Sequence, residues 1–199
     1  MESSRFALSG GRKSPEKIVS RDEGIRPDST PEGLAKLRPA FKPDGTVTAG
    51  NASQLSDGAA ATVIASGAAV GRLGAKPLAR IVSYATSGVA PKDIFIAPIG
   101  AIRMAIEKAK LSLADIDLIE LNEAFAAQML ACGKGLGLDE TKLNVNGGAV
   151  ALGHPIGASG ARVLTTLVHA LHKRGLRYGL ASLCLGGGNA VAMVVERAG

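Results

Sequence analysis

The sequence predicts an α/β fold in which helices cover a mixed β-sheet. Strand-like and helix-like apolar patterns alternate from residue 77 to residue 185, which is typical of βαβ units. Two apolar strands then follow one another across Gly186–Gly188, and a glycine turn between strands predicts a hairpin. Parallel and antiparallel pairing are therefore expected in one sheet. With 46% hydrophobic but only 3% aromatic residues, small and branched aliphatic side chains must fill the core.

Residues 1–46 are polar, basic and proline-rich, so irregular structure with one short helix is expected there. Thr30 can cap that helix at Pro31–Arg38, since proline is favoured at the first helical position. A turn with a short strand is expected at Gly45–Ala49, followed by a polar loop at Gly50–Ser56.

The next stretch, rich in small residues, predicts one strand and one helix. Ala59–Ala65 is a nearly continuous apolar run, which indicates a buried strand. Ser66–Leu73 has helical character, and Gly74 can end that helix in a left-handed conformation.

From Pro77 onward, the periodicity of the apolar residues defines each element. Alternating β-branched residues predict strands, whereas apolar residues three and four apart, as at Ile102, Ala105 and Ile106, predict helices. Gly175 can end the last helix. The expected elements are a strand at Leu78–Thr86, a helix at Gly100–Leu111, a strand at Asp117–Leu121, a helix at Glu123–Gly135, a strand end at Leu143–Asn146, a helix at Ser159–Arg174, and strands at Tyr178–Leu185 and Asn189–Glu196.

Charge and cysteine usage restrict the classes of function. The net charge of +6 favours anionic partners such as phosphates, but scattered basic residues and the absence of tryptophan argue against nucleic-acid binding by base stacking. Cys132 and Cys184 have neither metal nor disulfide spacing, so we expect no metal site and a reducing, cytoplasmic environment. The N-terminus lacks the apolar core of a secretory signal, and no apolar run of about 18 residues predicts a membrane crossing.

Three polar segments lie at the ends of expected strands, where open α/β sheets usually bind ligands. Asn122 follows the strand at Asp117–Leu121, and it can either cap the next helix or orient a water or a carbonyl. His154 lies in the glycine-rich run Asn144–Arg162, where it can either cap a helix or take part in chemistry. Cys184 ends a strand. A cysteine in that position is either inert core or a reactive thiol.

Cys184 is followed, after one leucine, by three glycines whose backbone N–H groups can bind a developing oxyanion. A neighbouring histidine or helix N-terminus can lower the pKa of such a thiol, whereas Cys132, inside a helix, is interpreted as core. Together with Asn122 and His154, Cys184 suggests carbon–carbon chemistry on an acyl thioester. The cysteine would remove the α-proton as a thiolate, while the histidine and an asparagine-held water stabilise the enolate oxygen.

Six motifs along the chain match one known family in order and in spacing. Thirty-two residues separate Asn122 from His154, and 30 separate His154 from Cys184. The motifs are KLRPAF (36–41), DGTVTAGNAS (44–53), SDGAAA (56–61), NEAFA (122–126), NVNGGAVALGHPIGASGAR (144–162) and CLGGGNA (184–190). By these motifs the chain resembles the thiolase family, the acyl-CoA:acetyl-CoA C-acyltransferases, from Arg26 to Glu196.

The resemblance implies a role for each catalytic position. The asparagine of NEAF, Asn122 here, would hold a catalytic water. The histidine of GHP, His154, would activate a nucleophilic cysteine and line the first oxyanion hole. Cys184 would be the acid and base for the α-proton, and the backbone N–H of Gly186 would help to form the second oxyanion hole.

The resemblance also implies that coenzyme A thioesters are the substrates and that no further cofactor is needed. Arg26 would lie near the nucleotide, and Ala49 and Ser53 along the pantetheine. Many relatives carry serine shortly before KLRPAF, where this chain has Gly33, which implies one fewer hydrogen bond to CoA. The positions implied to contact CoA are Arg26, Phe41, Ala49, Ser53, Ala124 and Phe125.

The thiolase fold consists of two similar βαβαβαββ halves in five layers, and the resemblance assigns this chain mainly to the second. It implies a remnant of the covering loop domain at 1–46, the last strand and helix of the N-terminal half at 47–76, and the C-terminal domain at 77–199. The loop with the family's nucleophilic cysteine has no counterpart in the chain. We therefore expect no thiolysis or condensation by the chain alone. We also expect association into a homo-oligomer or with a separate N-terminal half.

Two hypotheses for function remain at this point. The chain is either the catalytic half of a thiolase-type acyltransferase or a non-catalytic thiolase fragment that binds CoA or another protein. Ketoacyl synthases use Cys-His-His or Cys-His-Asn sites without a second cysteine, so Cys184 argues against them. The acyl chain length and the direction of the reaction, biosynthetic or degradative, are left open.

Overall fold

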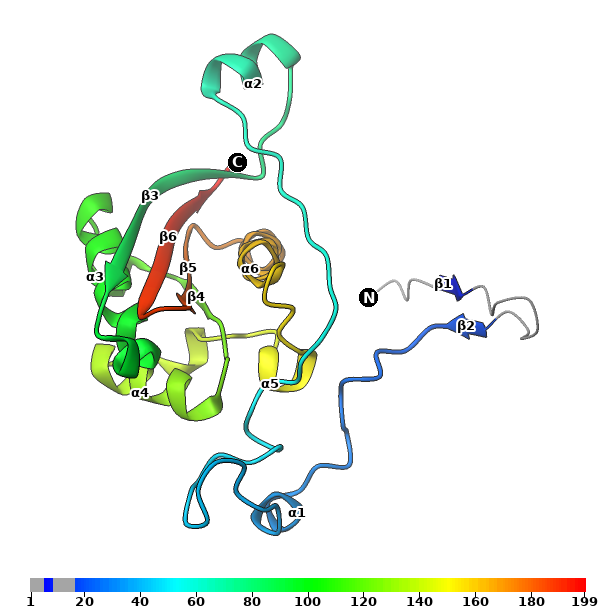
Figure 1. Ribbon diagram of the computed structural model, residues 1–199. Coiled ribbons are helices and arrows are strands. Elements are labelled where there is room, and N and C mark those ends of the chain that lie inside the picture. Colours follow the sequence, from blue (N-terminus) through cyan, green and yellow to red (C-terminus); the bar gives the residue numbers. More distant parts are fainter. Residues whose placement is uncertain (1–5, 9–16) are drawn as a thin grey trace.

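The core of the structure, a computed structural model that describes residues 6–8 and 17–199, is a four-stranded mixed sheet (Figure 1). The strands lie in the order β3-β6-β5-β4. β4 and β5 are parallel, whereas β6 is antiparallel to both of its neighbours. The α/β fold with a mixed sheet and a terminal hairpin is therefore confirmed. The strands are β3 (Ala79–Gly88), β4 (Leu118–Leu121), β5 (Tyr178–Leu185) and β6 (Asn189–Arg197).

Two helices cover one face of this sheet (Figure 1). α3 (Ala97–Ala109) packs on β3 and β6, and α4 (Ala126–Leu136) lies beside it. Ile102 of α3, Cys132 of α4 and Leu180 of β5 are buried in one apolar cluster. The interpretation of Cys132 as core is therefore confirmed.

A single long helix, α6 (Ser159–Arg174), covers the opposite face. Its apolar side carries Val163, Leu167 and Leu171, all buried against β4 and β5. A Cβ atom at Gly179 would lie 2.8 Å from Leu167 Cδ1, which is too close for a side chain at that position. Glycine at this point of β5 thus allows α6 to approach the sheet closely.

The helix ends follow the capping residues in the sequence. α1 (Pro31–Ala35) begins after Thr30, whose hydroxyl accepts a first-turn N–H. α2 (Gly67–Leu73) begins after Ser66 in the same way and ends at Gly74, which has a φ of 58°. Both short helices confirm the expectation, because a local cap decides where each begins.

The expected buried strand at Ala59–Ala65 is wrong. These residues are irregular and exposed, and Val63 is 98% exposed. They form the long cyan trace that leads to α2 in Figure 1. An apolar, β-branched run becomes a strand only where a neighbouring strand can bond its backbone groups. Nothing among the described residues supplies that neighbour.

Two other expected strands are reduced to single bridges. At Gly45–Ala49 the only β-pairing in the described chain is an isolated bridge between Pro39 and Thr48. Leu143–Asn146 contributes one parallel bridge to Ile119. Both segments are held mainly by side-chain and turn hydrogen bonds, which the strand pattern does not encode.

Several short elements were not expected. Residues 1–46 contain one antiparallel pair of short strands besides α1, while the expected irregular character of residues 1–5 and 9–16 lies outside the described residues. Among the described residues, no helix is long and apolar enough to span a bilayer. The unexpected elements are β1 (Phe6–Leu8), β2 (Lys17–Val19), α5 (Ala149–Leu152) and the 3₁₀ helices η1 (Pro91–Ile96), η2 (Leu113–Asp115) and η3 (Glu140–Lys142).

Replacing Leu167 tests how strongly the fold depends on α6. Leu167→Ala should lower the free energy of unfolding by about 2–5 kcal/mol, because it leaves a cavity at a fully buried position. Leu73→Ala in α2 is the matched control, since Leu73 is 70% exposed and should change stability by less than about 0.5 kcal/mol. Urea denaturation of both variants measures this. Equal effects would contradict the assignment of the core.

Candidate active site

Asn122 and His154 meet at the end of β4. The backbone N–H of Asn122 donates to Ser182 O at 3.0 Å, so the strand pairing of β4 with β5 continues to this residue. Its side-chain Nδ2 lies 3.3 Å from His154 Nε2. The parallel pairing of β4 with β5 therefore fixes the position of Asn122, and the side chain of Asn122 contacts the ring of His154.

The backbone of His154 is held by the segment that crosses over it. Its N–H donates to Gln54 O at 3.2 Å, and Leu55 forms a parallel bridge with His154. Just before the histidine, Gly153 has a φ of 95°, and any side chain there would overlap Ser56. Glycine is required at that position for both conformation and space.

The hydrogen bonds around the imidazole define its tautomer. The Ser159 hydroxyl donates its hydrogen to Pro155 O at 3.0 Å. Ser159 Oγ must therefore act as the acceptor toward His154, whose Nδ1–H donates to it at 2.6 Å. The other ring nitrogen, Nε2, then carries a lone pair and accepts from Asn122 Nδ2. His154 is thus arranged as a base with Nε2 as its basic atom.

The charge state of His154 agrees with that role. Burial, and then the positive charge of Arg162, lower the pKa of His154 below its ordinary value. The ring is therefore neutral at pH 7 and free to accept a proton. The Nε and Nη1 atoms of Arg162 are buried and have no hydrogen-bond partner within the described part of the chain.

A buried carboxyl group lies on the same side of β4 as Asn122. Glu120 is fully buried, and its Oε1 has no partner among residues 6–8 and 17–199. Burial raises the pKa of Glu120 to about 7, with the charge of Arg162 opposing the rise and that of Glu123 adding to it. A carboxyl group with this pKa is partly protonated at neutral pH.

Cys184 lies near the end of β5, two residues beyond Ser182, and thus at the same edge of the sheet as Asn122. Burial raises the pKa of the Cys184 thiol above its ordinary value. A neighbouring histidine or helix N-terminus could have lowered this pKa, but desolvation of the half-buried thiol outweighs the one opposing cause, a backbone hydrogen bond of Cys184 itself. The resting group is therefore a thiol, which can donate a proton before it accepts one.

The glycine turn after Cys184 is tight. Gly187 and Gly188 have φ values of 82° and 94°, and a side chain at Gly188 would overlap Val89 O. Gly186 is exposed, and its carbonyl accepts from Asn189 Nδ2 at 3.4 Å. The turn thus presents its backbone at the surface next to the cysteine, as a ligand-facing turn requires.

Four of the six positions implied to contact CoA lie together. Ser53 donates to Ala124 O from both its backbone N, at 3.2 Å, and its hydroxyl, at 2.9 Å. The ring of Phe125 packs edge-on against Phe41, with 6.2 Å between centroids, and against Phe95 at 5.2 Å. The two loops therefore form one continuous surface.

Ala49 and Arg26 are placed differently from this group. Ala49 is exposed in the turn that leads to Asn51, whose carbonyl accepts from Ala126 N at 2.8 Å. This bond, rather than an Asn122 cap, fixes the start of α4, so the alternative of Asn122 as helix cap is wrong. Arg26 is exposed, and its side chain forms no hydrogen bond or ion pair with this group among the described residues.

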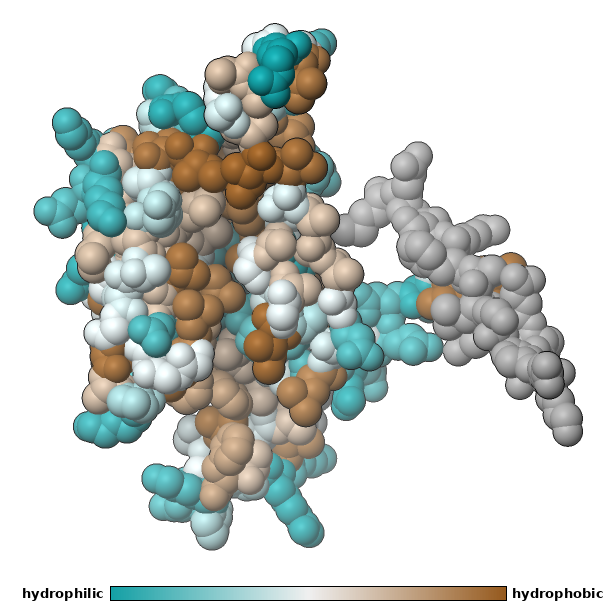
Figure 2. All heavy atoms as spheres, turned by 45° about the horizontal axis from the view of Figure 1, so that its top comes forward, coloured by the Kyte–Doolittle hydropathy of each residue, from teal (hydrophilic) through white to brown (hydrophobic). Residues whose placement is uncertain are grey.

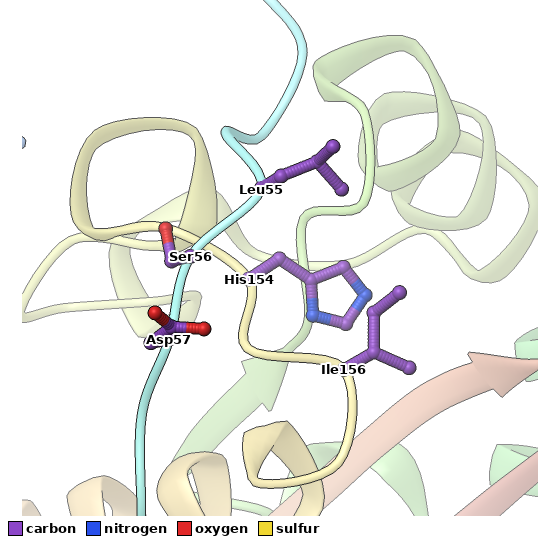
Figure 3. Close-up of a pocket in the computed structure, with 5 residues that line it drawn as sticks. All are labelled: Leu55, Ser56, Asp57, His154 and Ile156. Atoms are coloured by element: carbon purple, nitrogen blue, oxygen red, sulfur yellow. The ribbon is translucent and has the colours of Figure 1, made fainter.

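An open hollow of about 300 Å³ lies beside the imidazole. It is lined by Leu55, Ser56, Asp57, His154 and Ile156. Figure 3 shows the Leu55 and Ile156 side chains and the imidazole projecting toward the same side. Leu55 and Ile156 are both largely exposed, so this side of His154 has an apolar rim that nothing in the described chain covers.

Sequence reasoning missed three residues that shape this site. Ser159 fixes the tautomer, Arg162 depresses the pKa of His154, and Glu123 bonds the histidine loop. The signal that could have identified them is their place in the motifs: Ser159 and Arg162 belong to GHPIGASGAR, and Glu123 belongs to NEAFA. No group of three His, Cys, Asp or Glu residues suitable for a metal ion occurs in the described ranges.

Comparisons with known proteins identify the family of the chain. A family model described as the thiolase C-terminal domain matches residues 75–197, and one described as the thiolase N-terminal domain matches residues 8–68. The chain belongs to the thiolase family.

Individual thiolases are similar over nearly the whole chain. An acetyl-CoA acetyltransferase of Escherichia coli is 59% identical over 180 residues, which are 90% of this chain and 46% of the relative. The crystal structure of the Bacillus anthracis acetyl-CoA acetyltransferase matches with a TM-score of 0.92 and 52% identity, covering 98% of this chain and 49% of that one.

The human mitochondrial 3-ketoacyl-CoA thiolase in complex with CoA matches with a TM-score of 0.85 and 47% identity, covering 92% of this chain and 46% of that one. The chain thus spans about half the length of the thiolases that it matches. Its thiolase fold is confirmed, and the match lies mainly with the C-terminal half.

The pKa of His154 should depend on Arg162. Arg162→Gln removes a positive charge that opposes protonation, so the pKa of His154 should rise toward 6.5. The contribution of His154 to the free energy of unfolding should fall as the pH drops below about 6.5, because the unfolded state binds that proton more tightly. Glu120 acts in the opposite direction over this range, since its raised pKa makes the folded state bind a proton more tightly. NMR titration of the imidazole measures the pKa directly. Arg72→Gln, on exposed α2, is the control, and an equal response in both variants would contradict the electrostatic account.

Proposed function

We propose that the chain supplies the C-terminal half of a thiolase active site that acts on acetyl-CoA and 3-ketoacyl-CoA. The observation that carries the proposal is the hydrogen-bonded series Asn122–His154–Ser159 at the sheet edge where Cys184 also lies. A neutral histidine with a basic Nε2, an amide and a thiol are groups that can serve proton transfer next to a thioester carbonyl.

In the thiolysis direction, Cys184 acts as the acid. The nucleophilic cysteine of the N-terminal half, as a thiolate, bonds to the β-carbon and keeps the acyl group as a thioester, from which CoA then takes it as the second product. The bond between the α- and β-carbons of the 3-ketoacyl-CoA breaks, and its electron pair remains on the α-carbon as an acetyl-CoA enolate. The Cys184 thiol, whose pKa is raised by burial, gives its proton to that carbon. In the condensation direction the thiolate takes the proton back. Gly186 N–H helps to form the second oxyanion hole, which stabilises the charge that develops on the oxygen of the acyl group held by the nucleophile.

His154 acts on a nucleophile that this chain does not carry. Its Nε2 takes the proton of a cysteine thiol, and the protonated ring then donates to the enolate oxygen of acetyl-CoA in the first oxyanion hole. Asn122 positions both the ring of His154 and a catalytic water. The buried Oδ1 of Asn122, without a partner among the described residues, suits an acceptor for that water.

We further propose that coenzyme A thioesters are bound without another cofactor. Ser53, Ala124, Phe41 and Phe125 form the surface along which the pantetheine lies, and Ala49 extends it. Arg26, exposed at the start of this segment, interacts with the nucleotide phosphates. The relative that was crystallised with CoA supports this ligand.

The partner that we propose is a polypeptide with the N-terminal thiolase fold, either a separate subunit or a further part of a homo-oligomer. None of the residues 18–82 is buried, so within the described part of the stretch that matches the N-terminal domain, residues 18–68, there is no core. Leu55, Val63, Ile64 and Leu73 are largely exposed there. Figure 2 shows hydrophobic residues exposed on the face of the molecule that it draws, including a group near the top of the view. We place the enzyme in the cytoplasm, consistent with two free cysteines.

A non-catalytic fragment that binds CoA or another protein is the second candidate. The exposed apolar residues of the 55–73 stretch favour it, because they suit a binding module as well as a half-enzyme. The two candidates differ in whether the histidine and cysteine matter once a nucleophile is supplied.

Co-expression with an N-terminal half decides between them. The chain alone should cleave no acetoacetyl-CoA, and the complex with the N-terminal half of the E. coli relative should do so. Cys184→Ala and His154→Ala should each lower kcat at least about 100-fold, since each removes a proton-transfer group. The assay is thiolysis of acetoacetyl-CoA, with the mass of the purified complex verifying assembly.

Cys132→Ala is the matched control, because Cys132 is a buried core thiol and should leave kcat within about a factor of two in the folded complex. An assembled complex that binds CoA but cleaves nothing would favour the non-catalytic fragment. Robust cleavage by the chain alone would contradict the need for a partner.

A further inference from the structure

The residue after Asn122 bonds the histidine loop. The half-buried carboxylate of Glu123 accepts from Asn144 Nδ2 at 2.8 Å through Oε1 and from Val150 N at 3.1 Å through Oε2. Val150 belongs to α5, which ends two residues before His154. One side chain therefore connects the loop of Asn122 with the loop of His154.

Asn144 cannot adjust to a different partner. Its Oδ1 accepts from Leu121 N at 2.9 Å, and its Nδ2 donates to Leu121 O at 2.9 Å. Its backbone is left-handed, with a φ of 45°. Rotating the amide by half a turn would break both bonds to β4, so Nδ2 is fixed as the donor toward Glu123.

Gly148 provides the space that the carboxylate occupies. A Cβ atom at this position would overlap the carboxyl carbon and both oxygens of Glu123. The Gly148 backbone is extended, with φ −135° and ψ −172°, which any residue can adopt. Glycine is needed here for close approach and not for conformation, and its replacement is therefore a purely steric test of the contact.

We propose that Glu123 is a positioning residue, which acts through the carboxylate latch formed by Glu123, Asn144, Gly148 and Val150. The latch holds the His154 loop at a fixed distance from the Asn122 loop, and so sets the contact between Asn122 Nδ2 and His154 Nε2. Its consequence for turnover rests on the proposed thiolase function, whereas its effect on the imidazole is a property of the chain itself.

The latch requires a carboxylate at position 123. Both oxygens accept from donors that are fixed, one on Asn144 and one on the α5 backbone. A glutamine would present one NH₂ group to one of these donors, which replaces attraction by repulsion. Glu123→Gln should therefore release the loop although it preserves the shape of the side chain.

The first measurement uses the unchanged chain. The Val150 amide should exchange with solvent slowly, because the carboxylate holds it, and ¹⁵N shifts should show the His154 ring as the Nδ1–H tautomer. Exchange of the Val150 amide at the rate of an unprotected amide would overturn the proposal, whatever the variants do.

The second measurement compares variants that disturb the latch in two ways. Glu123→Gln and Gly148→Ala should both shift the His154 ¹⁵N signals toward a mixture of tautomers, and the double variant should add nothing further. Glu107→Gln and Gly160→Ala are the matched controls: Glu107 is exposed on α3, and a Cβ at Gly160 meets no atom within 4 Å. Unchanged His154 signals in both folded latch variants would overturn the proposal.

The third measurement uses the complex with an N-terminal half. The two latch variants should lower kcat for thiolysis about 10- to 100-fold while KM stays within about a factor of two, since the CoA surface is untouched. If the unchanged complex is inactive, the thiolase proposal fails, but the amide exchange and the ¹⁵N signals still decide the latch. If the unchanged complex is active and the folded variants keep its kcat, the latch fails and the thiolase proposal stands.

Discussion

The packing of α6 on β4 and β5 sets the position of nearly every polar group in the site. Leu167 and Leu171 hold the helix to the sheet, and Gly179 lets it come close. The first turn of the same helix carries Ser159, which is fully buried and bonds the imidazole, and Arg162, which depresses its pKa. Apolar burial along one helix thus fixes the electrostatics at its N-terminal end, because a rigid helix transmits the position of its core residues to its first turn.

The resting protonation states divide the chemistry between two residues. Burial lowers the pKa of His154 and raises that of the Cys184 thiol, so at neutral pH the first is a neutral base and the second a protonated acid. Desolvation acts in opposite directions on the two pKa values because it always disfavours the charged form. A single cause, removal from water, therefore prepares an acid and a base at one sheet edge.

The elements with strong local signals could be predicted from the sequence, and those that depend on distant partners could not. α6 and β5 begin and end as their apolar patterns and terminal glycines require. The run at Ala59–Ala65 has an equally clear strand pattern and forms no strand, because a strand also needs a neighbour that the pattern does not specify. Motif spacing located Asn122 and His154. It did not reveal Glu123, whose importance appears only when the space beside Gly148 is seen to be filled by its carboxylate.

The central claim is that this chain carries the groups that act on the α-carbon, and that the nucleophile comes from elsewhere. Hydrogen exchange of acetyl-CoA tests it most directly, in a complex whose N-terminal half has its nucleophilic cysteine replaced by alanine. In D₂O, NMR should show the acetyl methyl protons exchanging for deuterium, and Cys184→Ala should abolish that exchange. Exchange that continues at the same rate without the Cys184 thiol would contradict the account.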